Sequence, residues 1–142
     1  MTKRERVFAK YDGKCAYTGK PLGDDWQIDH ITSKISHRWN VYYAARTPDD
    51  IPVMLKEVDK DENLIPALRI VNHYKRSLDL EQFRSRMMTF HIRLGKLPKN
   101  TKVSATVKRI AYMNEVAEDF GITPDKPFEG KFYFEKLEED EE

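Results

Sequence analysis

Three separated segments of this chain carry residue types that can hydrolyse a phosphodiester bond. They contribute an adjacent acid and imidazole, two amides and an ammonium group: Asp29, His30, Asn63, Asn72 and Lys75. Phosphodiester hydrolysis needs a base that takes a proton from water and a cation that neutralises the phosphate. Imidazole is the commonest base in proteins, and carboxylate and amide oxygens suit Mg²⁺. Together the segments predict metal-assisted phosphodiester hydrolysis.

Asp29 and His30 are expected at the end of a strand, because neighbours within a regular strand point to opposite faces. Asn72, arriving from a helix, is expected to supply the metal's second protein ligand through its side-chain carbonyl. Two protein ligands leave room for water and phosphate oxygens, which fits one Mg²⁺ ion. An isolated Asp-His pair is common and usually not catalytic, so the prediction depends on its occurrence together with Asn63, Asn72 and Lys75.

The same segments resemble the HNH endonucleases, or ββα-metal nucleases, over roughly residues 13–85. Asp29-His30 matches the family's first motif and Asn63 its middle asparagine. Asn72 lies nine residues after Asn63, the family's spacing for its last catalytic position. The resemblance implies that His30 is the general base and that Asp29 and Asn72 hold one Mg²⁺ or Mn²⁺ ion. It also implies that Asn63 braces the loop and orients His30.

The resemblance further implies a DNA substrate, expected to be double-stranded, and a phosphate contact by Lys75. Four other side chains are candidate DNA contacts: Arg76, His73, His37 and Arg38. Consecutive helical residues diverge by about 100°, so His73 is expected to point away from the metal that Asn72 would hold. For His37, an ordinary surface histidine is the simpler interpretation.

Many members of the family hold a structural zinc ion with two Cys-x-x-Cys pairs around this core. The corresponding positions here are Cys15, Thr18, Leu68 and Val71, so three of the four ligands are missing. A lone cysteine cannot build a tetrahedral site, and no structural zinc is expected. Leu68 and Val71 are instead predicted to make a small apolar contact with Cys15 and Tyr17.

The elements that would position these residues begin with a helix at 4–11, a turn at 13–23 and a strand at Trp26–Ile31. Residues 32–61 are predicted to be a long loop with a single helical turn, because serines, threonines and prolines interrupt every period. Aromatic and basic residues are mixed there, which is typical of a surface that stacks on bases and contacts phosphates. Aromatic rings that fold back over the core are an equally good interpretation.

An α+β fold is predicted: a small ββα core, an N-terminal helix, and a C-terminal helical hairpin with a short strand. The core's second strand is expected at 63–66, followed by a helix that begins near Pro66 and carries Asn72 and Lys75. Residues 1–134 are expected to form one domain, with the core at about 13–85 and a helical extension at about 86–134.

A helix that leads into this extension is expected to begin at Asp79, which with Gln82 has the pattern of an N-cap and its reciprocal partner. This helix should reach Leu94. A second helix is predicted at 104–120, with Gly121 as its stop, and the two helices should pack as a hairpin. A short aromatic strand is expected at 131–134 and a frayed acidic tail at 135–142.

Charge is unevenly distributed along the 142 residues. The formal net charge is +1, but six acids lie in the last eight residues, so residues 1–134 hold 24 basic and 18 acidic groups and carry +6. A basic body favours a polyanionic partner, although solubility alone would also explain it. The single cysteine excludes an intrachain disulfide, and no apolar run approaches the roughly 20 residues that span a bilayer.

An intracellular, cytoplasmic protein without a membrane partner is therefore expected, and a phage or mobile-element origin and a homodimer are both compatible with the sequence. Two alternatives to a nuclease stay open. One is a nucleic-acid-binding module that keeps the fold but has little or no activity, although Asp29, His30 and Asn72 argue against it. The other is an interaction protein that acts through its C-terminal hairpin.

Overall fold

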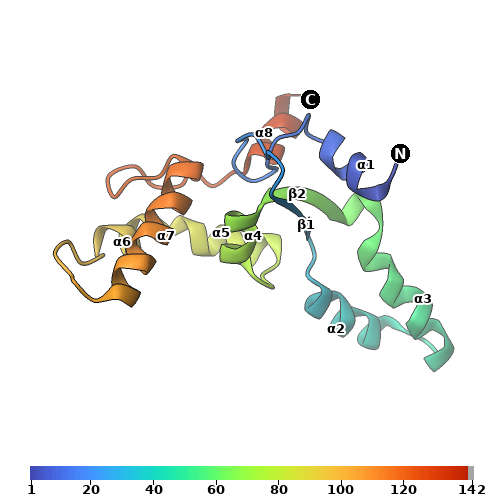
Figure 1. Cartoon of the computed structure of the whole chain (residues 1–142). Helices are drawn as coiled ribbons and strands as arrows, with labels where there is room; N and C mark the ends of the chain where they lie inside the picture. The colour runs from blue at the N-terminus through green and yellow to red at the C-terminus, as the bar shows by residue number, and fades with distance from the viewer. Residues whose placement is uncertain (141–142) are drawn as a thin grey trace.

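A two-stranded antiparallel sheet lies at the centre of an α+β fold, in a computed structural model that describes residues 1–140 (Figure 1). Strand β1 (Trp26–His30) pairs with β2 (Leu64–Leu68), and His30 lies opposite Leu64. Nearly all of β2 is buried. Its Pro66 has no N–H to donate, which an edge strand tolerates, and the Pro66 carbonyl accepts a hydrogen bond from the Ala16 N–H at 2.8 Å.

Helix α4 (Arg69–Lys75) follows β2 directly and contacts both strands. The predicted start near Pro66 is wrong, because pairing with β1 keeps the chain extended through Leu68. The order strand, strand, helix places the end of β1 beside α4. Residues 26–30 and 69–75, which are far apart in the sequence, therefore lie next to each other.

The N-terminal helix and the turn after it are confirmed. Helix α1 (Lys3–Ala9) begins after Thr2, whose side chain accepts a hydrogen bond from the Glu5 N–H. The knuckle at 13–23 closes through a bridge between Lys14 and Pro21. Gly19 has a φ of +75°, which other residues rarely adopt, and its N–H returns to the Cys15 carbonyl at 2.8 Å.

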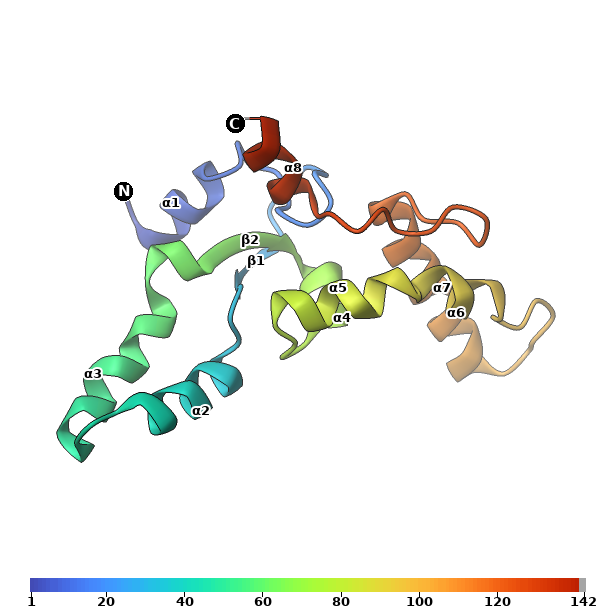
Figure 2. The same cartoon turned by 180° about the vertical axis from the view of Figure 1, so that it is seen from behind.

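Residues 34–55 form a helical arm that projects from the sheet, where a long loop was predicted (Figures 1 and 2). Its helices are α2 (Lys34–Ala44) and α3 (Ile51–Leu55), joined by a 3₁₀ turn at Pro48–Asp50. The prediction treated Ser33 as an interruption, but its side chain caps α2 by accepting from the Ser36 N–H at 3.1 Å. Turns at Lys56–Asp59 and Asp61–Asn63 lead back to β2.

The predicted helix after Asp79 is divided into α5 (Leu80–Met88) and α6 (Phe90–Gly95). The reciprocal cap formed by Asp79 and Gln82 is confirmed. The helix breaks at Thr89, where the Arg93 guanidinium donates to the Arg86 carbonyl at 2.7 Å and to the Thr89 hydroxyl. These bonds satisfy polar groups that the break releases.

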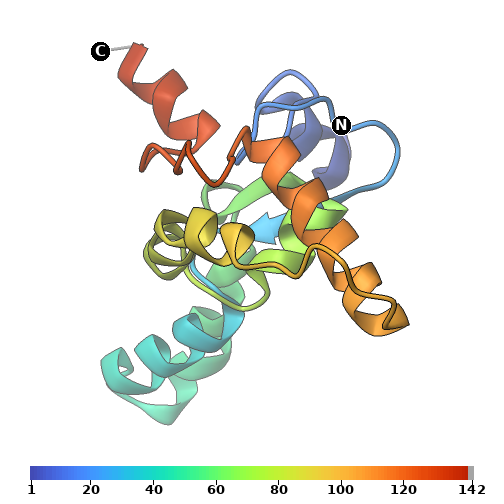
Figure 3. The ribbon, with the colours of Figure 1, turned by 90° about the vertical axis from the view of Figure 1, so that its left-hand side faces the viewer.

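Helix α7 (Ser104–Phe120) has the predicted bounds, and Gly121 ends it with a φ of +71°. It contacts α6, so the predicted hairpin is present. The first helix of the hairpin is shorter than predicted. Figure 3 views the molecule from the hairpin side, and Figure 1 shows that the hairpin and the helical arm lie at opposite ends. None of the described helices is both long and apolar enough to cross a membrane.

The C-terminal segment is helix α8 (Tyr133–Asp140), so the predicted short strand at 131–134 and the frayed tail at 135–140 are wrong. The first N–H groups of the helix donate to the knuckle: Tyr133 to the Tyr17 carbonyl and Phe134 to the Ala16 carbonyl. Phe132, just before the helix, is fully buried. The last two residues of the predicted tail, 141 and 142, lie outside the described residues.

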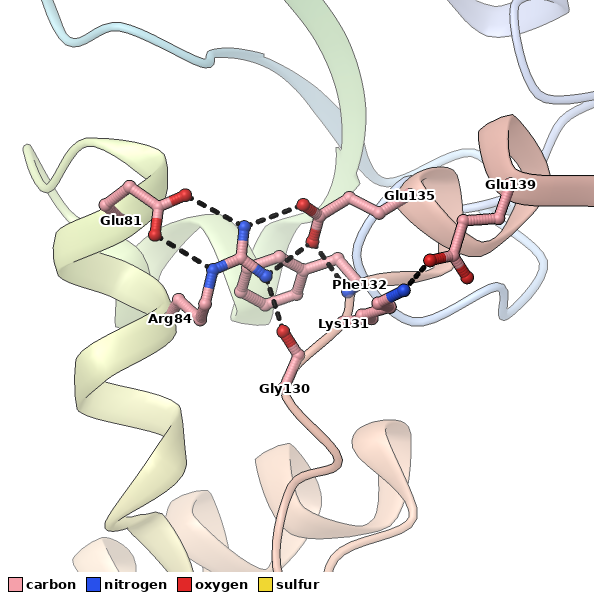
Figure 4. A network of polar contacts seen from close by, with 7 residues as sticks. All are labelled: Glu81, Arg84, Gly130, Lys131, Phe132, Glu135 and Glu139. Atoms are coloured by element: carbon pink, nitrogen blue, oxygen red, sulfur yellow. Dashed lines mark hydrogen bonds and ion pairs between the residues drawn. The ribbon is translucent and has the colours of Figure 1, made fainter. Parts of the chain in front are cut away.

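Arg84 of α5 clamps this segment in place (Figure 4). Its guanidinium donates to both carboxylate oxygens of Glu135, each at 2.7 Å, and to the Gly130 carbonyl at 2.5 Å. Glu135 also accepts from the Phe132 N–H, and Lys131 pairs with Glu139. With this segment held by Arg84, Phe132 packs in the core, where its ring stacks on Phe83 with centroids 5.2 Å apart.

Candidate functional site

A pocket of about 290 Å³ opens where the end of β1 meets α4 and the start of α2. It brings together three of the four side chains predicted to be catalytic or metal-binding: Asp29, His30 and Asn72. Lys34, Lys75 and Arg76 also line it, and Asp29 is the only carboxylate among residues 1–140 that does. The pocket therefore combines an imidazole and oxygen ligands with an excess of positive charge.

Asp59 holds the imidazole of His30 through a hydrogen bond of 2.9 Å between Nε2 and Oδ1. A carboxylate only accepts, so Nε2 carries the proton and Nδ1 of the neutral ring is left as an acceptor. The hydrogen bond with His30 lowers the pKa of Asp59, which keeps its carboxylate ionised. Sequence reasoning missed Asp59, because it lies 29 residues after His30 in a segment predicted to be loop.

Asn63 lies outside the pocket and ties two segments together behind His30. Its side chain accepts from the Thr32 N–H at 2.8 Å and donates to the carbonyls of Thr32 and Val58. Because Val58 directly precedes Asp59, these bonds brace the turn that carries the partner of His30. Among the described residues, the imidazole of His30 bonds to Asp59 and not to Asn63, so Asn63 can orient it only indirectly.

Asp29 is 6% exposed and belongs to a buried polar network. Its Oδ2 accepts from the Tyr17 hydroxyl at 2.5 Å and pairs with the Lys75 ammonium at 3.0 Å. Burial, and after it the negative charge of Asp29, raises the pKa of Tyr17 well above its ordinary value, so the hydroxyl stays a donor. The network fixes one carboxylate oxygen of Asp29 and leaves Oδ1 without a hydrogen bond to any of residues 1–140.

The burial of Lys75 does not fit the phosphate contact predicted for it. Its side chain is only 1% exposed, and its ammonium donates to the His30 carbonyl at 3.0 Å in addition to pairing with Asp29. Tyr74 and Val71 are buried on the same helix, so position 75 belongs to the inward side of α4. Lys75 thus fastens α4 to the end of β1 and compensates the charge of Asp29 there.

Asn72 is oriented by Gln27, whose Oε1 accepts from Asn72 Nδ2 at 2.7 Å. The side-chain nitrogen is thereby engaged, and the side-chain oxygen Oδ1 of Asn72 has no hydrogen-bond donor among residues 1–140. That oxygen and Asp29 Oδ1 are hard ligands of the kind that Mg²⁺ binds together with water. The donor set of the pocket therefore fits one such ion.

Arg76 is the exposed cation at the C-terminal end of α4. Its φ is +56°, uncommon for a residue with a side chain, and such a conformation costs about 1–3 kcal/mol. It ends α4 while its N–H still bonds to the Asn72 carbonyl at 3.0 Å. Arg76 lines the pocket and is exposed, as a phosphate contact would require.

The other candidate DNA contacts lie away from the pocket. His73 bonds to the Tyr112 hydroxyl at 2.8 Å, on the α7 side of α4. His37 Nε2 bonds to the Met54 carbonyl at 2.7 Å and so joins α2 to α3. Arg38 is exposed on α2.

The knuckle packs on the core next to this site. Cys15, Tyr17 and Val71 are buried in one cluster, and Leu68 packs against it. The Leu68 N–H also approaches Cys15 Sγ at 3.5 Å. The four residues thus belong to one apolar core, as the predicted contact requires, and Tyr17 reaches Asp29 from it.

Comparison of the chain with protein-family models, curated proteins and solved structures found no match. The function of the pocket is therefore inferred from its own side chains. Their arrangement offers an oriented proton acceptor, two oxygen ligands for a cation, and exposed positive charge for an anionic substrate.

Proposed function

We propose that this chain is a metal-dependent endonuclease of the HNH type that hydrolyses phosphodiester bonds in DNA. The observation that carries the proposal is the orientation of His30 by Asp59 in a pocket shared with Asp29 and Asn72. In this proposal β1, β2 and α4 form the ββα-metal core.

The residues of the pocket divide the chemistry among them. His30 accepts a proton from the attacking water at Nδ1, and Asp59 stabilises the imidazolium that results. Lys34 and Arg76 hold the scissile phosphate by charge-assisted hydrogen bonds. A Mg²⁺ or Mn²⁺ ion held by Asp29 and Asn72 would neutralise the phosphate and stabilise the departing oxygen.

Lys75 has a positioning role in this mechanism. Its ammonium pairs with Oδ2 of the buried Asp29 carboxylate and leaves Oδ1 as the oxygen that a cation would take. Its second bond, to the His30 carbonyl, fixes the backbone that carries the base. The base and the metal ligand are therefore held by one side chain.

Nicking of supercoiled plasmid tests the proposal. The chain should convert the plasmid to nicked or linear forms with Mg²⁺ or Mn²⁺ and not with EDTA. His30→Ala should lower the rate by about 100-fold or more, because general-base catalysis contributes about 10²–10⁴. His91→Gln, on α6 outside the pocket, serves as the matched histidine control and should cut like the parent.

Asp59→Ala in the same assay separates the oriented base from a histidine that merely lies nearby. Loss of a residue that orients a catalytic group typically costs about 10–100-fold in activity, so Asp59→Ala should be slower than the parent. The proposal fails if no DNA form is cut with any divalent ion, or if His30→Ala cuts as fast as the parent.

One observation favours a second function, a DNA-binding module that does not cut. The Lys75 ammonium already neutralises Asp29 without an added cation, so the site is complete as a folded structure. Such a module would bind DNA equally well in EDTA and in Mg²⁺. It would leave the plasmid intact in every arm of the nicking assay.

A further inference from the structure

One face of α2 is unusually exposed for a helix that carries large side chains. At about 100° per residue, six exposed side chains span about half of the helix circumference. In order around the helix they are Lys34, Arg38, Tyr42, Ile35, Trp39 and Tyr43. Trp39 is 60% exposed and Tyr43 86% exposed. These rings do not fold back over the core, which excludes one of the two interpretations that the sequence left open.

The opposite face of α2 is used for packing within the arm. Val41 is buried, and His37 is bonded to the Met54 carbonyl of α3. The start of the helix is fixed to α5, because the Asp79 carboxylate accepts from the Ser33 N–H at 2.7 Å and the Ser36 hydroxyl at 2.5 Å. The exposed face, here called the aromatic face, is therefore held in a fixed orientation by residues that do not belong to it.

The aromatic face begins at the candidate active site. Lys34 and Ile35 line the pocket of Asp29 and His30, and Trp39 and Tyr42 follow Ile35 at helical spacings of four and seven residues. At 1.5 Å per residue, the distance along the helix from Ile35 to Tyr42 is about 10 Å. Nucleotides of one DNA strand advance about 3.4 Å each, so the face spans about three nucleotides beyond the pocket.

Charge distinguishes this side of the arm from the other. Residues 31–48 contain no acid and three cations, Lys34, Arg38 and Arg46. The returning half, residues 49–62, contains six acids and two lysines. A polyanion is therefore attracted to α2 and repelled by the return segment. Amphipathic aromatic rings beside cations are the combination that binds single-stranded nucleic acid.

We propose that the aromatic face binds an unpaired stretch of DNA next to the bond that the pocket cleaves. Trp39 and the two tyrosines stack on bases, while Lys34 and Arg38 contact phosphates. Bases within an intact duplex are stacked on each other and offer the rings no free face. The substrate class is therefore DNA with an unpaired segment, and the place of this segment beside a cleaved bond rests on the proposed nuclease function.

Fluorescence anisotropy with the full chain carrying His30→Ala tests this binding without cleavage. The probes are a labelled DNA single strand of about 20 nucleotides, its duplex, and the RNA strand of the same sequence. The DNA single strand should bind more tightly than the duplex and at least as tightly as the RNA. Circular dichroism should show that further substitutions at Trp39 and Val53 leave the helical content of this chain unchanged, since both side chains are exposed.

Trp39→Leu and Trp39→Phe separate stacking from simple apolar contact. Trp39→Leu should weaken binding of the DNA strand about tenfold, the usual effect of losing one stacked base, whereas Trp39→Phe should stay close to the parent. Val53→Ala is the matched control, because Val53 is 68% exposed on α3, in the acidic half of the arm. It should leave the dissociation constant unchanged.

The outcomes separate this inference from the nuclease proposal. If plasmid is nicked but Trp39→Leu binds DNA like the parent, the nuclease stands and the aromatic face is wrongly assigned. If nothing is nicked while Trp39→Leu weakens strand binding, the face stands and the nuclease fails. Tighter binding of duplex or of RNA overturns the assignment. So does sedimentation that shows a dimer of this chain dissociated by Trp39→Leu with DNA binding unchanged.

Discussion

The buried pair of Lys75 and Asp29 decides how substitutions at this site must be interpreted. Removing one member leaves the other charge buried and unpaired, which typically costs about 3–5 kcal/mol. A loss of activity in Asp29→Asn would therefore combine lost metal binding with lost stability. A readout other than activity is needed to assign Asp29 as a metal ligand.

Lys75→Met provides that readout. Without added metal, the variant should be less stable than the parent by about 3–5 kcal/mol, because Asp29 loses its countercharge. Mg²⁺ should then stabilise Lys75→Met more than it stabilises the parent, since the ion replaces the missing positive charge without repulsion from the ammonium. Urea unfolding with and without Mg²⁺ measures both effects.

Lys34→Met is the control for this prediction, because Lys34 lines the same pocket but is exposed. Its stability should change by less than about 0.5 kcal/mol, and its response to Mg²⁺ should resemble that of the parent. Equal stabilisation of Lys75→Met and the parent by Mg²⁺ would argue against a cation at Asp29.

Local capping signals predicted the ends of α5 and α7 but not the start of α2 at Ser33, and long-range contacts account for the error at 131–134. The cap of α5 at Asp79 and the stop of α7 at Gly121 depend on neighbouring residues, and both were predictable from the sequence. The conversion of the segment at 131–134 to the start of α8 depends on carbonyls of the distant knuckle and on Arg84.

The same distinction applies within the site. Asp29, His30 and Asn72 could be identified from their types and spacing, and the pocket brings them together. Asp59, the hydrogen-bond partner of His30, could not be identified in this way. It reaches His30 only once the helical arm has folded and the chain has come back to the sheet. The inward direction of Lys75 likewise follows from how α4 packs on the strands, which spacing alone does not reveal.

The clamp on α8 leads to a prediction at the level of this element. Burial alone would raise the pKa of Glu135, but hydrogen bonds from Arg84 and the Phe132 N–H outweigh it, and the pKa is lowered. A lowered pKa means that the carboxylate contributes stability above the unfolded value of about 4.3 and loses it as pH falls through the folded value. Glu135→Gln should therefore destabilise the chain by about 1–3 kcal/mol near neutral pH.

The difference between Glu135→Gln and the parent should shrink as the pH falls from about 4.3 through the lowered pKa of Glu135, because the parent's carboxyl is then also protonated. Urea unfolding across this range measures it. Glu129→Gln is the control, since its pair with Lys136 at 3.5 Å is exposed and such pairs contribute about 0–1 kcal/mol. A destabilisation by Glu135→Gln that is the same at both ends of the range would mean that the charge of Glu135 is not what holds α8.

At the scale of the whole molecule, exposed pairs of cations lie on helices at two opposite ends. The helical arm carries Lys34, which lines the pocket, and Arg38 about one turn further along α2. The hairpin, at the opposite end of the molecule (Figure 1), carries Lys108 and Arg109, both exposed on α7. The sequence alone does not distinguish these groups, because both are basic and both lie on helices. Their positions distinguish the two groups, because only the helical arm carries its cations on a helix that begins at the pocket.

The salt dependence of binding separates the two ends. Each cation that contacts a phosphate of a single strand contributes about 0.7 to the slope of log affinity against log salt concentration. The double variant Lys34→Gln and Arg38→Gln should therefore lower that slope by about 1.4 for the labelled DNA strand. Lys108→Gln with Arg109→Gln removes the same charges from the hairpin and should leave it unchanged. An equal decrease in both double variants would mean that the strand is attracted by the overall charge of the molecule, and that the arm is not its specific path to the pocket.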